Sequence, residues 1–95
     1  MSIVVRYDAI GLTAETYDES TRQLAEAGVE RRPDGLDVHV CFGEDGKLQV
    51  SEIWDSREQF EAFGERLRQM PVLGQLGIEY SRAPDVFNVH AMVRR

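Results

Sequence analysis

Two runs of alternating apolar and polar residues, separated by a short turn, constrain the fold of this chain most. Apolar residues recur at every second position in residues 36–42 (Leu-Asp-Val-His-Val-Cys-Phe), and residues 48–54 form a second alternating run. A period of two is typical of a β-strand, because successive side chains of a strand point to opposite faces of the sheet. Gly43-Glu44-Asp45-Gly46, between the two runs, has the composition of a turn. The centre of the chain is therefore predicted to be a β-hairpin.

A helix pattern flanks this hairpin on each side. The first helix is predicted to begin after the N-cap Thr13 and to end at Gly28, and its narrow apolar stripe consists of Tyr17, Thr21, Leu24 and Ala25. The second begins after Ser56, with Gln59 completing a capping box, and its apolar face consists of Phe60, Phe63, Leu67 and Met70. Pro71 ends this pattern, and residues 72–78 are a weaker candidate for one more helical turn.

A further strand pattern lies near each end of the chain, at residues 3–7 and 86–93. The resulting order, β-α-β-β-α-β, predicts an α+β fold of the ferredoxin-like type. In this fold a four-stranded antiparallel sheet carries both helices on one face, and the second and fourth strands form its opposite edges. Residues 1–95 are expected to form a single domain.

The length of the chain limits how it can build a binding site. A chain of 95 residues has little material for both a hydrophobic core and a separate ligand cavity. A small-molecule site is therefore expected to take some of its walls from a second copy of the chain.

Charge and composition exclude several classes of function. The net charge is −6, and the Lys and Arg residues form no cluster, so nucleic acid is not an expected partner. No apolar stretch approaches the length of a membrane span or a secretion signal. Cys41 is the only cysteine, which excludes an internal disulfide. The sequence predicts a soluble cytoplasmic protein that binds neither nucleic acid nor a membrane.

The two sides of each predicted strand differ in polarity, which suggests how the sheet faces are used. The purely apolar sets are assigned to the face under the helices: Ile3/Val5/Tyr7, Val38/Val40/Phe42 and Phe87/Val89/Ala91/Val93. The mixed sets are assigned to the open face: Val4/Arg6, Asp37/His39/Cys41 and Val86/Asn88/His90/Met92. A hairpin loop over residues 43–46 places His39 opposite Val50, so that Val50, Glu52 and Trp54 join the open face, although a one-residue change in loop length reverses this. An open face this apolar predicts an interface or a ligand cavity.

The segment from strand to helix carries a family resemblance. Glu52, Trp54 and Ser56 at the strand end, followed by an aromatic residue near the start of the helix, resemble the central signature of the dimeric α+β barrel superfamily. Within that superfamily the segment is most similar to the antibiotic biosynthesis monooxygenase (ABM) group. The resemblance implies a homodimer whose two sheets close into a barrel, with a site in or beside the lumen.

Members of this group differ in activity, and the sequence departs from two of their patterns. Anthrone monooxygenases of aromatic polyketide pathways line the substrate site with an Asn, a Trp and a Tyr along this segment. Trp54 matches the Trp, whereas Val50 stands in place of the Asn and Phe60 in place of the Tyr. The haem-degrading branch uses a haem-ligating His on the second helix, and this chain has no His between His39 and His90. Haem degradation is therefore not expected.

Three residues are the candidates for catalysis. His39 and His90 are candidate general bases, because histidine titrates near neutral pH and can take a proton from a phenol or enol. They cannot meet within one subunit, but the implied barrel brings the fourth strand of one subunit to the second strand of the other. Glu52 is predicted either to orient a histidine or act as an acid, or instead to pair with Arg6 on the neighbouring strand. A metal site formed by His39, Glu52 and the His90 of a second copy is a weaker alternative, because no local ligand spacing supports it.

Five residues are the candidates for substrate binding: Trp54, Arg6, Asn88, Phe60 and Val50. Trp54 is either a packing anchor or a platform for an aromatic ligand, and Arg6 and Asn88 are placed to contact substrate oxygens. The leading hypothesis is a cofactor-independent monooxygenase that acts on an aromatic, polyketide-type molecule. The same base would also serve a cyclase or an isomerase. The alternative is a non-enzymatic dimeric binding or accessory protein.

Overall fold

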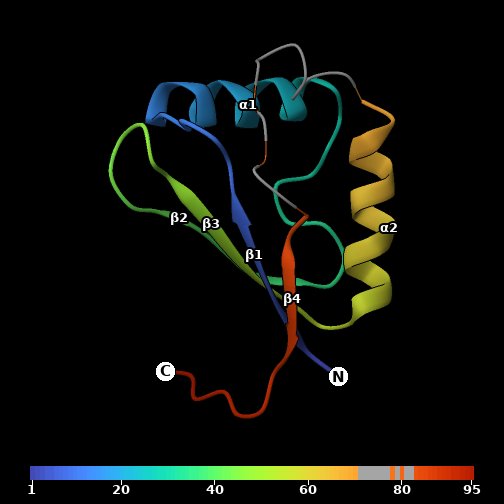
Figure 1. The fold of residues 1–95 in the computed structure, drawn as a ribbon. Coiled ribbons are helices and arrows are strands. Elements are labelled where there is room, and N and C mark those ends of the chain that lie inside the picture. The colour runs from blue at the N-terminus through green and yellow to red at the C-terminus, as the bar shows by residue number, and fades with distance from the viewer. Residues whose placement is uncertain (71–77, 79, 81–82) are drawn as a thin grey trace.

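The computed structural model describes residues 1–70, 78, 80 and 83–95 of the chain. In chain order, its elements are β1 (Ile3–Asp8), α1 (Ala14–Glu26), β2 (Leu36–Phe42), β3 (Gln49–Trp54), α2 (Arg57–Arg68) and β4 (Asp85–Asn88). The four strands form one sheet, in which β4, the last strand along the chain, pairs with β1, the first (Figure 1). The predicted α+β fold with a four-stranded antiparallel sheet is confirmed.

The strand order across the sheet is β2-β3-β1-β4, with every neighbouring pair antiparallel. The hairpin formed by β2 and β3 is joined to β1 through β3, and β4 pairs on the other side of β1. The predicted placement of the second and fourth strands at opposite edges is therefore correct. This order matches the ferredoxin-like arrangement.

Both helices begin at the N-caps that the sequence indicates. The Thr13 side chain accepts a hydrogen bond from the backbone N–H of Thr16, and the Ser56 side chain accepts one from the N–H of Gln59. Each cap satisfies one N–H of the first helical turn, which has no partner inside the helix. Gly28, with a φ of 83°, adopts a left-handed conformation just after α1, as expected for a helix stop.

Some boundaries differ from those predicted. α2 ends at Arg68, before Met70 and Pro71, and the turn suggested for residues 72–78 falls almost entirely outside the described residues. β4 ends at Asn88 rather than at residue 93. The segment after β4 leaves the sheet (Figure 1), and Arg94 forms an ion pair with Asp37.

The assignment of the β2 faces was wrong, and a β-bulge explains why. Leu36 pairs with Trp54 and Val38 with the adjacent Ile53, so Asp37 is one extra residue on β2. The insertion sends Leu36 and Val38 to opposite faces although they are two positions apart. Leu36 is buried under the helices, whereas the next apolar residues of the strand are exposed on the open face: Val38 at 43%, Val40 at 44% and Phe42 at 39%.

The same bulge carries the polar set of β2 to the helix-covered face. His39 pairs with Glu52 rather than with Val50, because the hairpin loop is two residues longer than predicted. A loop that is longer by two residues leaves the same side chains of β2 and β3 on the same face. The prediction that Val50, Glu52 and Trp54 lie on the face of His39 is therefore correct. That face, however, is the one under the helices and not the open one, because Trp54 packs with Ile3 and Val5 in the core.

β4 is also reversed relative to the prediction. Val86 pairs with Val5 and packs against the core, and Phe87 pairs with Val4 and is 54% exposed on the open face. Apolar residues occur on both faces of this strand, so the alternation of side chains alone could not identify the buried face. The open face thus carries an apolar patch of Val38, Val40, Phe42 and Phe87, hereafter the open-face patch.

The hydrophobic core lies between the centre of the sheet and α2. It consists of Ile3, Val5, Leu36 and Trp54, with Tyr7, Phe60, Phe63 and Val86 packed against it. The Trp54 ring meets the rings of Phe60 and Phe63 at centroid distances of 5.9 and 5.6 Å. Among the described residues, no helix is long and apolar enough to span a bilayer.

Candidate functional site

A cavity of about 1050 Å³ lies between the helix-covered face of the sheet and the two helices. α1 lines one side of this space with small or hydroxyl-bearing residues, Ser20, Thr21 and Ala25, together with the larger Tyr17 and Leu24. α2 closes the other side with Phe60, Phe63 and Leu67. Such a volume is at the upper end of the range for small-molecule sites. The described residues of one chain line this half-open cavity, and the expectation that a second copy supplies further walls stays a prediction.

His39 and Glu52 form a directly bonded pair on the wall of this cavity. They are opposite each other on β2 and β3, and His39 Nδ1 lies 2.6 Å from Glu52 Oε2. The Glu52 side chain is only 9% exposed and that of His39 is 34% exposed. Because a carboxylate only accepts hydrogen bonds, Nδ1 donates to Glu52, and in the tautomer with its proton on Nδ1 the other ring nitrogen, Nε2, is an acceptor. The prediction that Glu52 orients a histidine agrees with this geometry, and Arg6 is not its partner.

Trp54 holds Glu52 from the core side. Its Nε1 donates a hydrogen bond of 3.1 Å to Glu52 Oε1, and its ring is fully buried. The two oxygens of this buried carboxylate are thus bonded to different N–H groups, which offsets the cost of burying it. Trp54 does not line the cavity, so the geometry favours its interpretation as a packing anchor over a ligand platform.

Tyr17 of α1 completes a chain of hydrogen bonds across the cavity. Its hydroxyl lies 2.6 Å from His39 Nε2, and the two rings are nearly parallel, with an interplanar angle of 14°. Since Nε2 accepts, the phenol donates. Burial raises the pKa of Tyr17, with the neighbouring Cys41 adding to the effect. The hydroxyl therefore keeps its proton at neutral pH.

Two further phenols border the cavity near Glu52. Burial raises the pKa of Tyr7 far above its ordinary value, and the Glu52 carboxylate raises it further. Burial also raises the pKa of Tyr80, again with help from Glu52. Both groups therefore remain neutral hydrogen-bond donors in the pH range where a histidine titrates.

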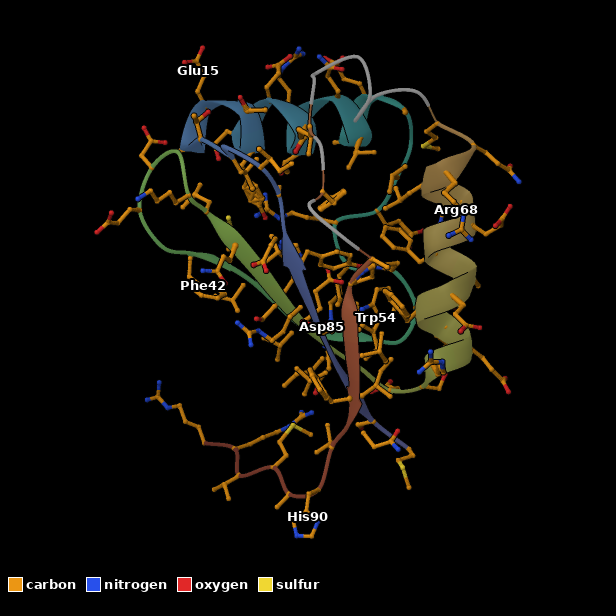
Figure 2. All side chains as sticks on the ribbon, in the orientation of Figure 1. Glu15, Phe42, Trp54, Arg68, Asp85 and His90 are labelled. Atoms are coloured by element: carbon orange, nitrogen blue, oxygen red, sulfur yellow. The ribbon has the colours of Figure 1, made fainter. Side chains whose placement is uncertain are left out.

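The other predicted site residues fall into two groups. Val50 and Phe60 line the cavity beside His39 and Glu52. Arg6 is exposed and pairs in register with Ser51 and Asp85 on the open face, away from the cavity. Asn88, at the end of β4, and His90, in the segment after it, are exposed, and Figure 2 shows His90 far from both helices. Within one chain, the structure thus brings together His39, Glu52, Val50 and Phe60.

Sequence reasoning missed Tyr17 as a site residue. It was assigned to an apolar stripe, where its spacing with Thr21 and Leu24 is correct. The available signal was the polarity of that stripe, because a tyrosine and a threonine facing a sheet bring hydroxyl groups that need partners. Arg31 was also missed. It lines the cavity near His39, and its charge opposes the rise in the pKa of Tyr17.

The arrangement provides a proton acceptor on the wall of a half-open, largely apolar cavity. A neutral imidazole whose Nδ1–H is bonded to a carboxylate is held in one tautomer, and the carboxylate stabilises the imidazolium that forms when Nε2 takes a proton. Among the described residues, no group of three or more His, Cys, Asp or Glu side chains is placed to hold a metal ion. The site as it stands favours acid–base chemistry on a ligand enclosed by aromatic and aliphatic side chains.

The fold is shared with proteins of known structure. SnoaB, a cofactor-independent oxygenase from Streptomyces nogalater, aligns over 99% of this chain and 96% of its own, with a TM-score of 0.63 and 18% identity for a mutant form. The structure of SnoaB determined to 1.9 Å gives 0.59 and 14%. A Deinococcus radiodurans protein, provisionally assigned as an antibiotic biosynthesis monooxygenase, covers 100% of this chain and 98% of its own, at 0.62 and 14%.

These matches show that the chain has the α+β fold of the ABM group, as the strand-to-helix segment indicates. At identities of 14–18% they establish the fold alone. No protein-family profile matches the sequence, and no curated protein matches it.

Proposed function

We propose that this protein is an ABM-like monooxygenase that needs no cofactor and oxidises an aromatic, polyketide-type small molecule. The observation that carries the proposal is the His39–Glu52 pair, whose atoms lie 2.6 Å apart on the wall of a cavity of about 1050 Å³. The fold shared with SnoaB, a cofactor-independent oxygenase, supports it. The cavity is large enough for a fused-ring ligand, and Phe60 and Phe63 offer aromatic walls.

In the proposed reaction, His39 removes a proton from a substrate whose conjugate base is stabilised by its rings. The C–H or O–H bond breaks, the electron pair stays on the substrate, and the proton is bound by the imidazole beside Glu52. The delocalised anion then gives electrons to molecular oxygen, the co-reactant. For a ring CH₂ group the net change is CH₂ + O₂ → C=O + H₂O, which balances without an external reductant.

Oxygen consumption tests this function directly. The purified protein is mixed with a set of hydroxylated polycyclic compounds that contain an activated CH₂ group, and oxygen uptake and the appearance of the quinone absorption are followed together. We expect one mole of oxygen consumed per mole of quinone formed, above the rate without protein. A cyclised or isomerised product without oxygen uptake would instead assign the same base to a cyclase or isomerase.

We also propose that the protein is a homodimer that pairs through the open-face patch. The patch exposes four large apolar side chains from β2 and β4, and neither α1 nor α2 covers this side of the sheet (Figure 1). Exposed apolar patches on a sheet are typical of interfaces. Because the cavity lies on the other face, the dimer would support the sheet and not complete the site.

Placing a charge in the open-face patch is expected to separate the dimer. Val40 is 44% exposed and lies in the middle of the β2 part of the patch, so Val40→Asp buries a carboxylate in the proposed interface without disturbing the core. In analytical ultracentrifugation at micromolar concentration, we expect a dimer mass for the wild type and 10.8 kDa for the variant. A wild-type mass of 10.8 kDa would refute the dimer.

The second candidate is a non-enzymatic binding protein. The enclosed cavity fits this reading also, since storage or transport of an aromatic ligand needs the same apolar walls. The His39–Glu52 pair favours catalysis, because pure binding does not require an oriented base. Tight binding of polycyclic phenols with no turnover, unchanged by His39→Ala, would favour the binding protein.

A further inference from the structure

We infer that Tyr17 is the group that meets the substrate, and that it passes the substrate's proton to His39. This inference rests on the proposed function, since it names the path by which the base acts. It starts from the contact between the Tyr17 hydroxyl and His39 Nε2, which are 2.6 Å apart. In the structure the basic nitrogen of His39 is already occupied, so a ligand cannot reach its lone pair without displacing Tyr17.

The geometry around His39 leaves the phenol as the accessible end of the relay. Nδ1 is bonded to Glu52 on one side of the ring, and Nε2 is bonded to Tyr17 on the other. The nearly parallel Tyr17 and His39 rings, with centroids 6.0 Å apart, keep the hydroxyl in line with the imidazole. The phenol oxygen has two lone pairs, so with Thr21 hydrogen-bonded to it one lone pair remains to accept from a ligand in the cavity.

The proton step then balances as a concerted double transfer. The substrate O–H bond breaks while an O–H bond forms at Tyr17, and the original Tyr17 O–H bond breaks while an N–H bond forms at His39 Nε2. The products are a substrate anion, an unchanged tyrosine and an imidazolium beside the Glu52 carboxylate. No oxidant enters this step, because oxygen reacts only afterwards with the anion.

Other groups around Tyr17 are compatible with this role. Cys41 of β2 raises the pKa of its hydroxyl, whereas Arg31 of the segment between α1 and β2 and a hydrogen bond with the Thr21 side chain lower it. Glu52 raises it by a smaller amount. Burial keeps the pKa of Tyr17 above its ordinary value, so the residue stays a neutral hydroxyl that can donate and accept in the same step. A phenolate at this position could not pass a proton to His39.

A chromogenic phenol tests the relay without any oxygen chemistry. The probe is 7-hydroxycoumarin, whose phenol and phenolate absorb at different wavelengths, and 7-methoxycoumarin is the matched ligand that cannot ionise. We expect wild-type protein to bind 7-hydroxycoumarin as the phenolate at a pH where the free compound is mostly phenol. Tyr17→Phe is expected to bind both coumarins as tightly, but to lower the rate of probe ionisation about 100-fold or more.

The phenylalanine variant separates a relay from a simple cover over His39. A phenyl ring at position 17 still covers Nε2 but has no hydroxyl proton to pass on, so the relay predicts a slower ionisation of the probe. If Tyr17 merely shields the base, Tyr17→Phe should ionise the probe as fast as wild type, and this result would overturn the relay while leaving His39 as the base. Glu15→Gln is the control on the same helix, since Glu15 is exposed and points away from the sheet (Figure 2).

Two further outcomes distinguish the relay from the proposed function. If the wild-type protein binds 7-hydroxycoumarin without ionising it, both the relay and the proposed role of His39 as a general base are overturned. Nitrogen-15 NMR of His39 in the ligand-free protein gives an independent readout: the relay requires a proton on Nδ1 and an Nε2 that accepts from Tyr17, with an Nε2 shift that changes in Tyr17→Phe. A proton on Nε2 in the wild type overturns the relay whether or not any probe binds.

Discussion

Replacing His39 with alanine is expected to lower the rate of substrate oxidation by a factor of about 100 to 10,000, the usual contribution of a positioned general base. The substitution removes the only imidazole on the cavity wall in the described part of the chain and leaves the buried Glu52 carboxylate without its Nδ1–H donor. The rate at saturating substrate should carry most of the effect, because the aromatic walls that bind the ligand are unchanged. Steady-state oxygen uptake over a range of substrate concentrations measures it.

His90→Ala decides between the two histidines that the sequence offers. The cavity of one chain contains His39 and not His90, which is exposed in the segment after β4. The present geometry therefore predicts a rate close to wild type for His90→Ala. Equal losses for the two variants would favour the sequence-based prediction of a site shared across a dimer. An unchanged rate in His39→Ala would rule out a catalytic role for that residue.

Replacing Trp54 with alanine is expected to lower the free energy of unfolding by about 3–5 kcal/mol, the range for removing a fully buried large aromatic side chain. Trp54 is 0% exposed, packs against Phe60 and Phe63, and donates to the buried Glu52. Domains of this size are stable by roughly 5–15 kcal/mol, so the variant should lose a large share of its stability. Urea denaturation followed by circular dichroism measures the change.

Ile10→Ala is the matched control for this experiment. Ile10 is a large apolar residue that is 58% exposed and lies outside the named strands and helices, so its truncation should change the free energy of unfolding by less than about 0.5 kcal/mol. If Trp54→Ala were as stable as Ile10→Ala, Trp54 would not anchor the core. The alternative role as a ligand platform would then regain support, and ligand affinity should fall instead.

Local patterns were sufficient to predict the elements and their connection. The N-caps Thr13 and Ser56 and the turn at 43–46 act within a few residues, so their effects can be read without knowing the rest of the molecule. The order of the elements then leaves few antiparallel arrangements, and the predicted strand order was correct. The prediction that His39, Val50 and Glu52 share one face was also correct, because an error of two residues in loop length does not change which side chains lie on the same face.

Which face each strand buries was settled by contacts between distant residues. The extra residue Asp37 in β2 reverses the faces of the strand. It shows in the pairing of Leu36 with Trp54, a residue eighteen positions later in the chain, and not in the local alternation of apolar and polar residues. For the same reason the cavity could not be predicted. Its lining comes from both helices and from β2 and β3, so its volume depends on how these distant segments pack against one another.

The residue types capable of chemistry, His39 and Glu52 above all, and the α+β fold that carries them were thus present in the sequence. Their bonding to each other and to Tyr17 was not, because it depends on the register of β2 against β3 and on the position of α1, whose Tyr17 lies twenty-two residues before His39 along the chain. Hydrogen bonds join atoms a few ångströms apart in space, and sequence spacing does not determine that distance between separate elements.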